Sequence, residues 1–134
     1  MHPLTVITIA AAAIAAIPAA ASAKARLAPE DQLAKLLEGR IAGAPQDCLP
    51  LSAVAGSRVI DGTAIVYDAG STLWVNRPDS GASLLHRDYM LVNRTSGRQL
   101  CSGDASKLRG QTNLIDRGSV SLGAFVPYRN VEAD

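Results

Sequence analysis

Apolar and polar residues alternate over much of the chain beyond residue 56, in short runs that turn residues separate. The runs cover residues 57–60, 63–68, 71–76, 89–94 and 119–126, and a further one is expected from Ala105 to Leu108. Asp61-Gly62 and Ala69-Gly70 are turn dipeptides, which favour tight hairpins between antiparallel strands. The pattern predicts roughly five or six short antiparallel strands, the first three of which form a meander.

One amphipathic helix is predicted ahead of these strands, over residues 29–38. Pro29 suits the first helical position, and the next two residues are acidic, which the helix dipole favours. Gly39 or Gly43 should end the helix. Leucines at helical spacing give it one apolar stripe, formed by Leu33, Leu36 and Leu37 and extended by Ile41.

The fold predicted from these elements is mainly β, a small antiparallel sheet or partly closed barrel with the helix over one face or one open end. Residues 44–51 contain two prolines and are predicted to be an irregular tether pinned by Cys48. Pro127 should end the last strand or mark a sheet edge.

The first 23 residues have the pattern of a secretory signal peptide. Residues 4–17 are apolar, Pro18 follows, and Ala21-Ser22-Ala23 provides the small residues that signal peptidase requires. Cleavage is expected between Ala23 and Lys24. An uncleaved membrane anchor is the alternative, although Ala is only weakly hydrophobic and a span needs about 20 apolar residues. The remaining residues, 24–134, are enough for one small domain.

The charge balance does not point to a polyanionic partner. The chain carries 13 basic and 12 acidic residues, and the arginines are scattered singly along it. A net charge of +1 gives no electrostatic case for nucleic acid or for an anionic membrane. The expected partner is an unknown envelope protein, peptide or glycan, and the expected state is a monomer without stable membrane insertion after cleavage.

The two cysteines, Cys48 and Cys101, are predicted to form a structural disulfide, because an even count in an exported chain indicates a bridge. Closing the loop between them contributes at most roughly 4 kcal/mol. The alternatives are a redox pair and metal ligation. A redox pair usually shows C-x-x-C, and a metal site needs further Cys or His, whereas His86 is the single histidine after residue 23. No metal or cofactor is therefore predicted.

Catalytic patterns are weak in this sequence. His86-Arg87-Asp88 puts a histidine near an acid, but neighbouring residues on a strand do not face each other. No nucleophile motif or zinc motif is present. The aspartates lie mostly beside Gly or Ser in expected turns, where their side chains bond to the backbone. We predict a protein that is not an enzyme, with a small hydrolase whose carboxylates converge only in space as the alternative.

A binding face is the better candidate. Alternation puts Tyr67 on one face of its strand and Trp74 on one face of the next, and if the two faces coincide, the sheet has one aromatic and one aliphatic side. If the helix covers the aromatic residues, they are core. If it covers the other side, they lie on an open face flanked by arginine, which could bind a glycan, a peptide or an anionic headgroup. The candidate residues are Arg58, Tyr67, Trp74 and Arg94, with Arg77 as another flanking arginine.

Three segments together resemble an uncharacterised family of small exported proteobacterial proteins, a domain of unknown function. They are Cys48-Leu49-Pro50-Leu51, residues 57–63 with Arg-Val-Ile-Asp, and residues 100–104 with Cys-Ser-Gly-Asp. The resemblance covers residues 40–128. It implies export and the disulfide, and it implies no activity.

Residues 80–83, Ser-Gly-Ala-Ser, resemble the Ser-Gly loop of periplasmic C-type lysozyme inhibitors, although Leu84 stands where that family has Tyr. Inhibition of a lysozyme-like hydrolase is therefore an alternative function. The leading hypothesis from the sequence is a periplasmic or secreted, non-enzymatic envelope protein that acts as a binding or structural module.

Overall fold

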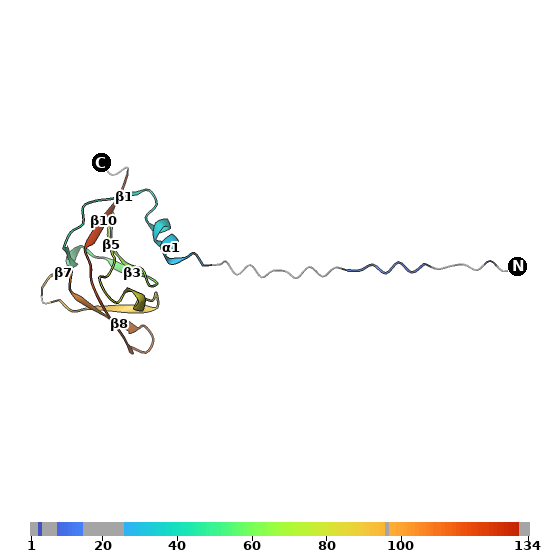
Figure 1. Ribbon diagram of the computed structural model, residues 1–134. Helices are drawn as coiled ribbons and strands as arrows, with labels where there is room; N and C mark the ends of the chain where they lie inside the picture. Colours follow the sequence, from blue (N-terminus) through green and yellow to red (C-terminus); the bar gives the residue numbers. More distant parts are fainter. Residues whose placement is uncertain (1–2, 4–7, 15–25, 96, 132–134) are drawn as a thin grey trace.

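A computed structural model describes residue 3 and residues 8–14, 26–95 and 97–131 of this chain. Residues 8–14 contain no helix or strand and are exposed, outside the folded domain (Figure 1). The predicted cleavage site, Ala23 and Lys24, lies outside the described residues. Within the described ranges, none of the helices has the length and apolar character needed to cross a bilayer.

The described domain contains one short α-helix, ten strands and two turns of 3-10 helix. In chain order they are α1 (Pro29–Leu36), β1 (Arg40–Ala42), β2 (Cys48–Pro50), η1 (Leu51–Ala53), β3 (Gly56–Ile60), β4 (Ala64–Ala69), β5 (Thr72–Asn76), η2 (Ala82–Leu84), β6 (Tyr89–Asn93), β7 (Gln99–Cys101), β8 (Ala105–Gly110), β9 (Asp116–Ser121) and β10 (Phe125–Asn130).

The strands form three antiparallel sheets. The largest has the order β1-β10-β5-β4-β3, a second has the order β6-β8-β9, and β2 pairs with β7. Helix α1 lies beside the large sheet, and β8 lies at the opposite end of the domain (Figure 1). The mainly β fold is confirmed, but with ten strands in place of five or six. Three of the extra strands have only three residues, which is too short for alternation to be visible.

Four local predictions are wrong, and the fourth concerns Pro127. Residues 48–50 are not an irregular tether, because they form β2, which pairs with β7. Ile41 does not extend the helical stripe, because α1 ends at Leu36 and Ile41 lies on β1 with 60% of its surface exposed. The single run 119–126 is divided into β9 and β10 by residues 122–124, which let the chain pass from one sheet to another.

Pro127 neither ends β10 nor lies on an edge strand, since β10 continues to Asn130 between β1 and β5. Its carbonyl accepts a 2.7 Å hydrogen bond from the N–H of Gly43, one residue beyond the end of β1. The N and C=O of a strand residue point to the same side. The nitrogen of Pro127, which carries no hydrogen, therefore faces a place where β1 has already ended. The strand pairing needs no hydrogen-bond donor at this position.

The domain has two hydrophobic cores, one on each face of the large sheet. On one face, Leu33 of α1 packs with aliphatic side chains of β3, β4 and β5, namely Ile60, Ala64, Val66 and Val75. On the other face, the large sheet packs against β2, β7 and the three-stranded sheet. That core contains Leu49, Val59, Ile65, Tyr67, Trp74, Leu85, Leu100, Leu108, Val120, Leu122 and Phe125.

Two connections fix these layers. The predicted disulfide is confirmed, and it joins Cys48 and Cys101, which face each other across the β2–β7 pair with their Cα atoms 4.0 Å apart. Arg77, just after β5, donates two hydrogen bonds of 2.8 and 3.0 Å to the carboxylate of Glu30 in the first turn of α1. These hydrogen bonds hold the pKa of Glu30 below its usual value. The pair is exposed, so its contribution to stability is small.

Asn76 links β5 to the β9–β10 connection from a fully buried position. Its side-chain amide donates to the carbonyl of Gly123 over 2.8 Å and accepts from the N–H of Gly123 over 3.0 Å. Gly123 has no room for a side chain, because a Cβ there would overlap the carbonyl oxygen of Arg77. One buried amide thus substitutes for a strand neighbour where the ladder is interrupted.

Candidate binding groove between two sheet edges

Strands β3 and β6 are edge strands of two different sheets, and residues of both line one cavity. β3 ends the large sheet and β6 ends the three-stranded sheet. Among the described residues, no backbone hydrogen bond joins the two strands. The barrel predicted from the sequence is therefore open at this place.

The direction of the free backbone groups follows from the pairing of each strand. Ala69 and Thr72 close a two-residue hairpin, so Gly56, Arg58 and Ile60 of β3 bond to β4. The N–H and C=O groups of Ser57 and Val59 then point away from the sheet. On β6, the N–H of Arg94 bonds to the carbonyl of Ala105, so by alternation the backbone groups of Leu91 point toward the open edge.

Among the described residues, hydrogen bonds join the segments beside the two edges at one end. Leu85 accepts a 2.9 Å hydrogen bond from the N–H of Gly62, in the turn after β3. The carboxylate of Asp61 accepts a 2.7 Å hydrogen bond from the N–H of Arg87. Beyond these contacts the edges border a cavity of about 380 Å³, lined by residues 57–59 of β3, residues 89–91 of β6, Arg87 and Gln111. We call this cavity the edge groove.

Tyr89 separates the edge groove from a second hollow. That hollow, of about 360 Å³, is lined by His86, Asp88, Arg117 and residues 110–113, and it shares Tyr89 and Gln111 with the edge groove. The guanidinium carbon of Arg117 lies 5.9 Å from the centre of the Tyr89 ring, and the ring of His86 lies 5.2 Å from it. A half-exposed aromatic side chain between two polar hollows is a suitable platform for a bound chain.

His86 and Asp88 approach each other, but not in a catalytic arrangement. Nδ1 of His86 is 3.6 Å from the Asp88 carboxylate, yet it accepts a 3.2 Å hydrogen bond from the Asp88 N–H. An acid that orients a general base must instead accept the Nδ1 proton. Both side chains are also largely exposed, by 44% and 70%. In the described part of the chain, no three of the residues His, Cys, Asp and Glu come together as metal ligands would.

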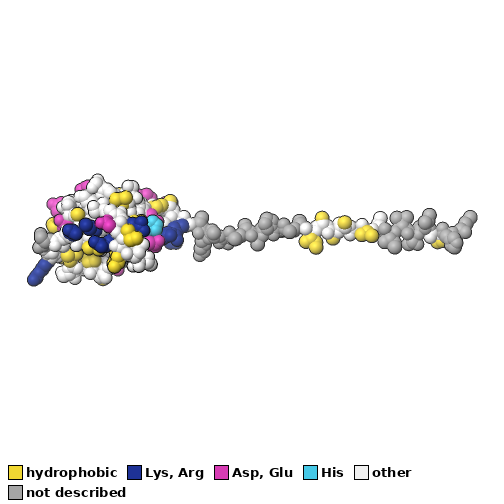
Figure 2. Space-filling model, turned by 90° about the horizontal axis from the view of Figure 1, so that it is seen from below, with side chains coloured by type: hydrophobic (Ala, Val, Ile, Leu, Met, Phe, Trp, Pro, Cys, Tyr) yellow, Lys and Arg dark blue, Asp and Glu magenta, His cyan; other side chains and the backbone are white. Residues whose placement is uncertain are grey.

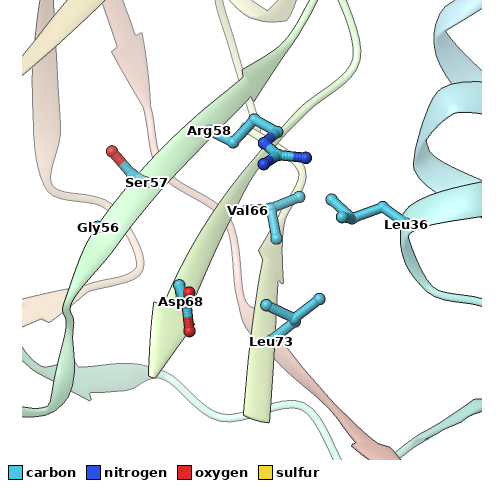
Figure 3. A pocket seen from close by; sticks show the side chains of 7 residues that line it. All are labelled: Leu36, Gly56, Ser57, Arg58, Val66, Asp68 and Leu73. Atoms are coloured by element: carbon cyan, nitrogen blue, oxygen red, sulfur yellow. The ribbon is translucent and has the colours of Figure 1, made fainter. Parts of the chain in front are cut away.

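The other side of β3 carries a smaller hollow beneath the end of α1 (Figure 3). It encloses about 230 Å³ between Leu36 of α1 and Val66 and Leu73 of the sheet, with Asp68 at its rim. The side chain of Arg58 reaches over Val66 toward Leu36, whereas Ser57 points away from the helix (Figure 3). Arg58 thus borders both this hollow and the edge groove.

Of the two alternatives that the sequence left open for the aromatic residues, the open face is not present and the core position is. Tyr67 and Trp74 do lie opposite each other on one face of the sheet, but they are only 2% and 8% exposed. Helix α1 covers the aliphatic face, and the other sheets cover the aromatic one. Arg58 lies on the helix side of β3, and Arg94 follows the far end of β6. The four candidate residues therefore do not form one site.

Tyr89 was not a candidate in the sequence, although it bears on the groove more directly than Tyr67 or Trp74. Its one signal was an aromatic residue at the beginning of a predicted strand.

The segment 80–83 does not form a free loop, because Ser121 donates a 3.0 Å hydrogen bond to the carbonyl of Ser80. A Cβ on Gly81 would lie 2.6 Å from the carbonyl oxygen of Ser119, so the segment lies closely against β9.

Comparison with known proteins identified no relative. No family model, no curated protein and no solved structure matches this chain.

Proposed function

We propose that this chain is an exported, non-enzymatic envelope protein that binds an extended peptide segment of a partner by strand addition in the edge groove. One observation carries the proposal: two open sheet edges border the same cavity and direct free backbone groups toward it. An open edge is a template for an additional strand, and many peptide-binding domains use one. The main-chain hydrogen bonds would provide affinity without requiring a particular sequence.

The side chains around the edge groove indicate which peptides suit it. Arg58 has no ion-pair partner among the described residues, whereas Arg87 lies 3.9 Å from Asp61 and 3.7 Å from Asp88. An acidic residue of the peptide would therefore pair best with Arg58. Tyr89 provides an aromatic contact for the residues that continue into the second hollow.

The proposed location is the periplasm or the exterior of the cell. The confirmed disulfide is consistent with an oxidising compartment outside the cytoplasm. The leader-like pattern of residues 1–23 supports export. The two alternative functions gain no comparable support. For a lysozyme inhibitor, the segment 80–83 lies against β9. For a hydrolase, no acid orients His86.

The proposal can be tested by selecting peptides from a random display library on the purified chain from Lys24 to Asp134. We expect selected peptides to protect backbone amides of β3 and β6 from hydrogen exchange and to leave β10 unchanged. Ser57→Pro removes one outward N–H from the edge of β3, and Ser57→Ala keeps it. Because an unpaired backbone group costs about 1–3 kcal/mol, Ser57→Pro should weaken binding by roughly tenfold, while Ser57→Ala should bind as the wild type.

Three results of the peptide experiments would contradict strand addition, and a fourth could come from the protein alone. They are a failure to select any peptide, protection confined to other strands, and equal affinity of the Pro and Ala variants. Protection of β3 and β6 that rises with protein concentration in the absence of peptide would show self-association through the same edges, which also contradicts the proposal. Circular dichroism of both variants establishes that each is folded.

A further inference from the structure

The outer face of the three-stranded sheet combines exposed apolar residues with basic ones. Met90 and Val92 of β6 are 40% and 36% exposed, because their neighbours Tyr89 and Leu91 face the core. Their cross-strand partners on β8 are Arg109 and Lys107. Figure 2 views the domain from the end where Figure 1 shows β8, and Lys and Arg side chains gather there beside apolar ones.

The hairpin between β8 and β9 adds two larger apolar side chains at its tip. Leu114 and Ile115 are 57% and 51% exposed. Three hydrogen bonds fix the conformation of this turn. The N–H of Leu114 donates to the carbonyl of Gly110 over 3.0 Å, and the N–H of Gly110 donates to the carbonyl of Ile115 over 3.1 Å. The N–H of Ile115 donates to the side-chain oxygen of Asn113 over 3.2 Å. The fold thus holds two branched apolar residues in water in a fixed position.

Leu114 also has an unfavourable backbone conformation. Its φ is 56°, which makes it the one residue other than glycine with positive φ in the described part of the chain. For a branched side chain this region is strained, at a cost of roughly 1–2 kcal/mol. Strain of this kind is typical of functional sites. An exposed leucine in a strained turn is unfavourable in water, which suggests that it contacts something outside the domain.

The charge of this face exceeds what the net charge of the chain suggests. Arg94, Lys107 and Arg109 have no ion-pair partner within 4 Å among the described residues. The acid on the face is Asp116, opposite Arg109. Its pKa is lowered by a hydrogen bond from the N–H of Gly118 and by the charges of Lys107 and Arg109. The face is therefore a basic surface bordered by an apolar hairpin tip.

We propose that this face docks on the anionic headgroup surface of a phospholipid bilayer, with Leu114 and Ile115 in the interface and Lys107 and Arg109 beside lipid phosphates. Apolar residues at a fixed protruding tip partition into the headgroup region, and basic residues near the surface add electrostatic attraction. The contact is peripheral. It goes beyond peptide binding, because the backbone groups of the edge groove point along the sheet while the side chains of Lys107 and Arg109 point out of its outer face.

The test uses sedimentation of the mature chain with vesicles of phosphatidylcholine alone or mixed with phosphatidylglycerol. We expect binding to the mixed vesicles at low ionic strength and weak binding to the neutral ones. Leu114→Asn combined with Ile115→Ser should lower the partition coefficient at least about tenfold. Asn tolerates positive φ, so this variant should fold. Lys107→Gln or Arg109→Gln should each lower the coefficient roughly fivefold.

Matched controls lie outside the face. Ile41→Ser removes an equally exposed apolar residue from β1, and Arg98→Gln removes a basic residue beside β7. Both should bind mixed vesicles as the wild type does. Equal binding to neutral and anionic vesicles, unchanged partition of the tip variant, or no vesicle binding would each overturn the proposal. Peptide selection on the tip variant is a separate readout, so failure of one proposal is distinguishable from failure of the other.

Discussion

The five-stranded sheet is covered on both faces, whereas the three-stranded sheet is covered on one. In β4 the residues Ala64, Ile65, Val66 and Tyr67 are all buried, because α1 lies on one side and the other sheets lie on the other. In β6 and β8 only alternate residues face the core. The two sheets therefore contribute differently to the domain. The first carries most of the packing, and the second presents a free face and a free edge to its surroundings.

The largest difference in stability is expected between two asparagine substitutions, one at the buried Asn76 of the large sheet and one at the half-buried Asn93 of the small sheet. Asn76→Ala leaves both backbone groups of Gly123 without partners in the core, which should lower the free energy of unfolding by about 2–4 kcal/mol. Asn93 accepts one 2.6 Å hydrogen bond from Ser106, so Asn93→Ala should cost about 1 kcal/mol. Urea unfolding of both variants measures the difference, and equal losses would contradict the assignment of Asn76 as a buried link.

A matched pair of valines tests the covered and the free face directly. Val66 is 3% exposed beneath α1, and Val66→Ala should cost about 1–2 kcal/mol. Val92 is 36% exposed on the outer face of β6, and Val92→Ala should change stability by less than about 0.5 kcal/mol. Thermal unfolding at several protein concentrations measures both effects. If Val92→Ala costs as much as Val66→Ala, the outer face is covered in solution and is not free to meet a membrane.

Part of this arrangement could be predicted from the sequence, because it depends on local patterns. The helical stripe of Leu33, Leu36 and Leu37 does pack on the large sheet. Gly62 and Gly70 adopt positive φ in the predicted turns. The cysteine pairing follows from the number of cysteines and the expected compartment.

The rest depends on long-range packing. Alternation shows neither that the faces of Tyr67 and Trp74 coincide nor which face the helix covers; the strand register and the packing decide both. The edge groove combines β3 and β6, which are far apart in the chain and meet only through tertiary structure. Net charge is a sum over the whole chain, so it concealed the basic outer face, where Lys107 and Arg109 come together through alternation on β8.

A gain of stability is expected at Tyr67, whose hydroxyl is buried in the core on the covered side. Among the described residues it has no hydrogen-bond partner. Tyr67→Phe keeps the ring, which lies 5.8 Å from the ring of Phe125, and removes the unsatisfied hydroxyl. The variant should therefore be more stable than the wild type, by up to about 1 kcal/mol at neutral pH. A loss of stability would show that the hydroxyl has a partner after all.

The same substitution should change how stability depends on pH. Burial raises the pKa of Tyr67 well above its usual value, so the folded protein keeps the phenol neutral. Above about pH 10 the unfolded chain loses this proton and the folded chain does not, and stability falls as pH rises. Tyr67→Phe should reduce this alkaline loss. Urea unfolding of the wild type and the variant between neutral pH and pH 11 measures the difference, and an identical decline in both proteins would show that Tyr67 ionises as freely when folded as when unfolded.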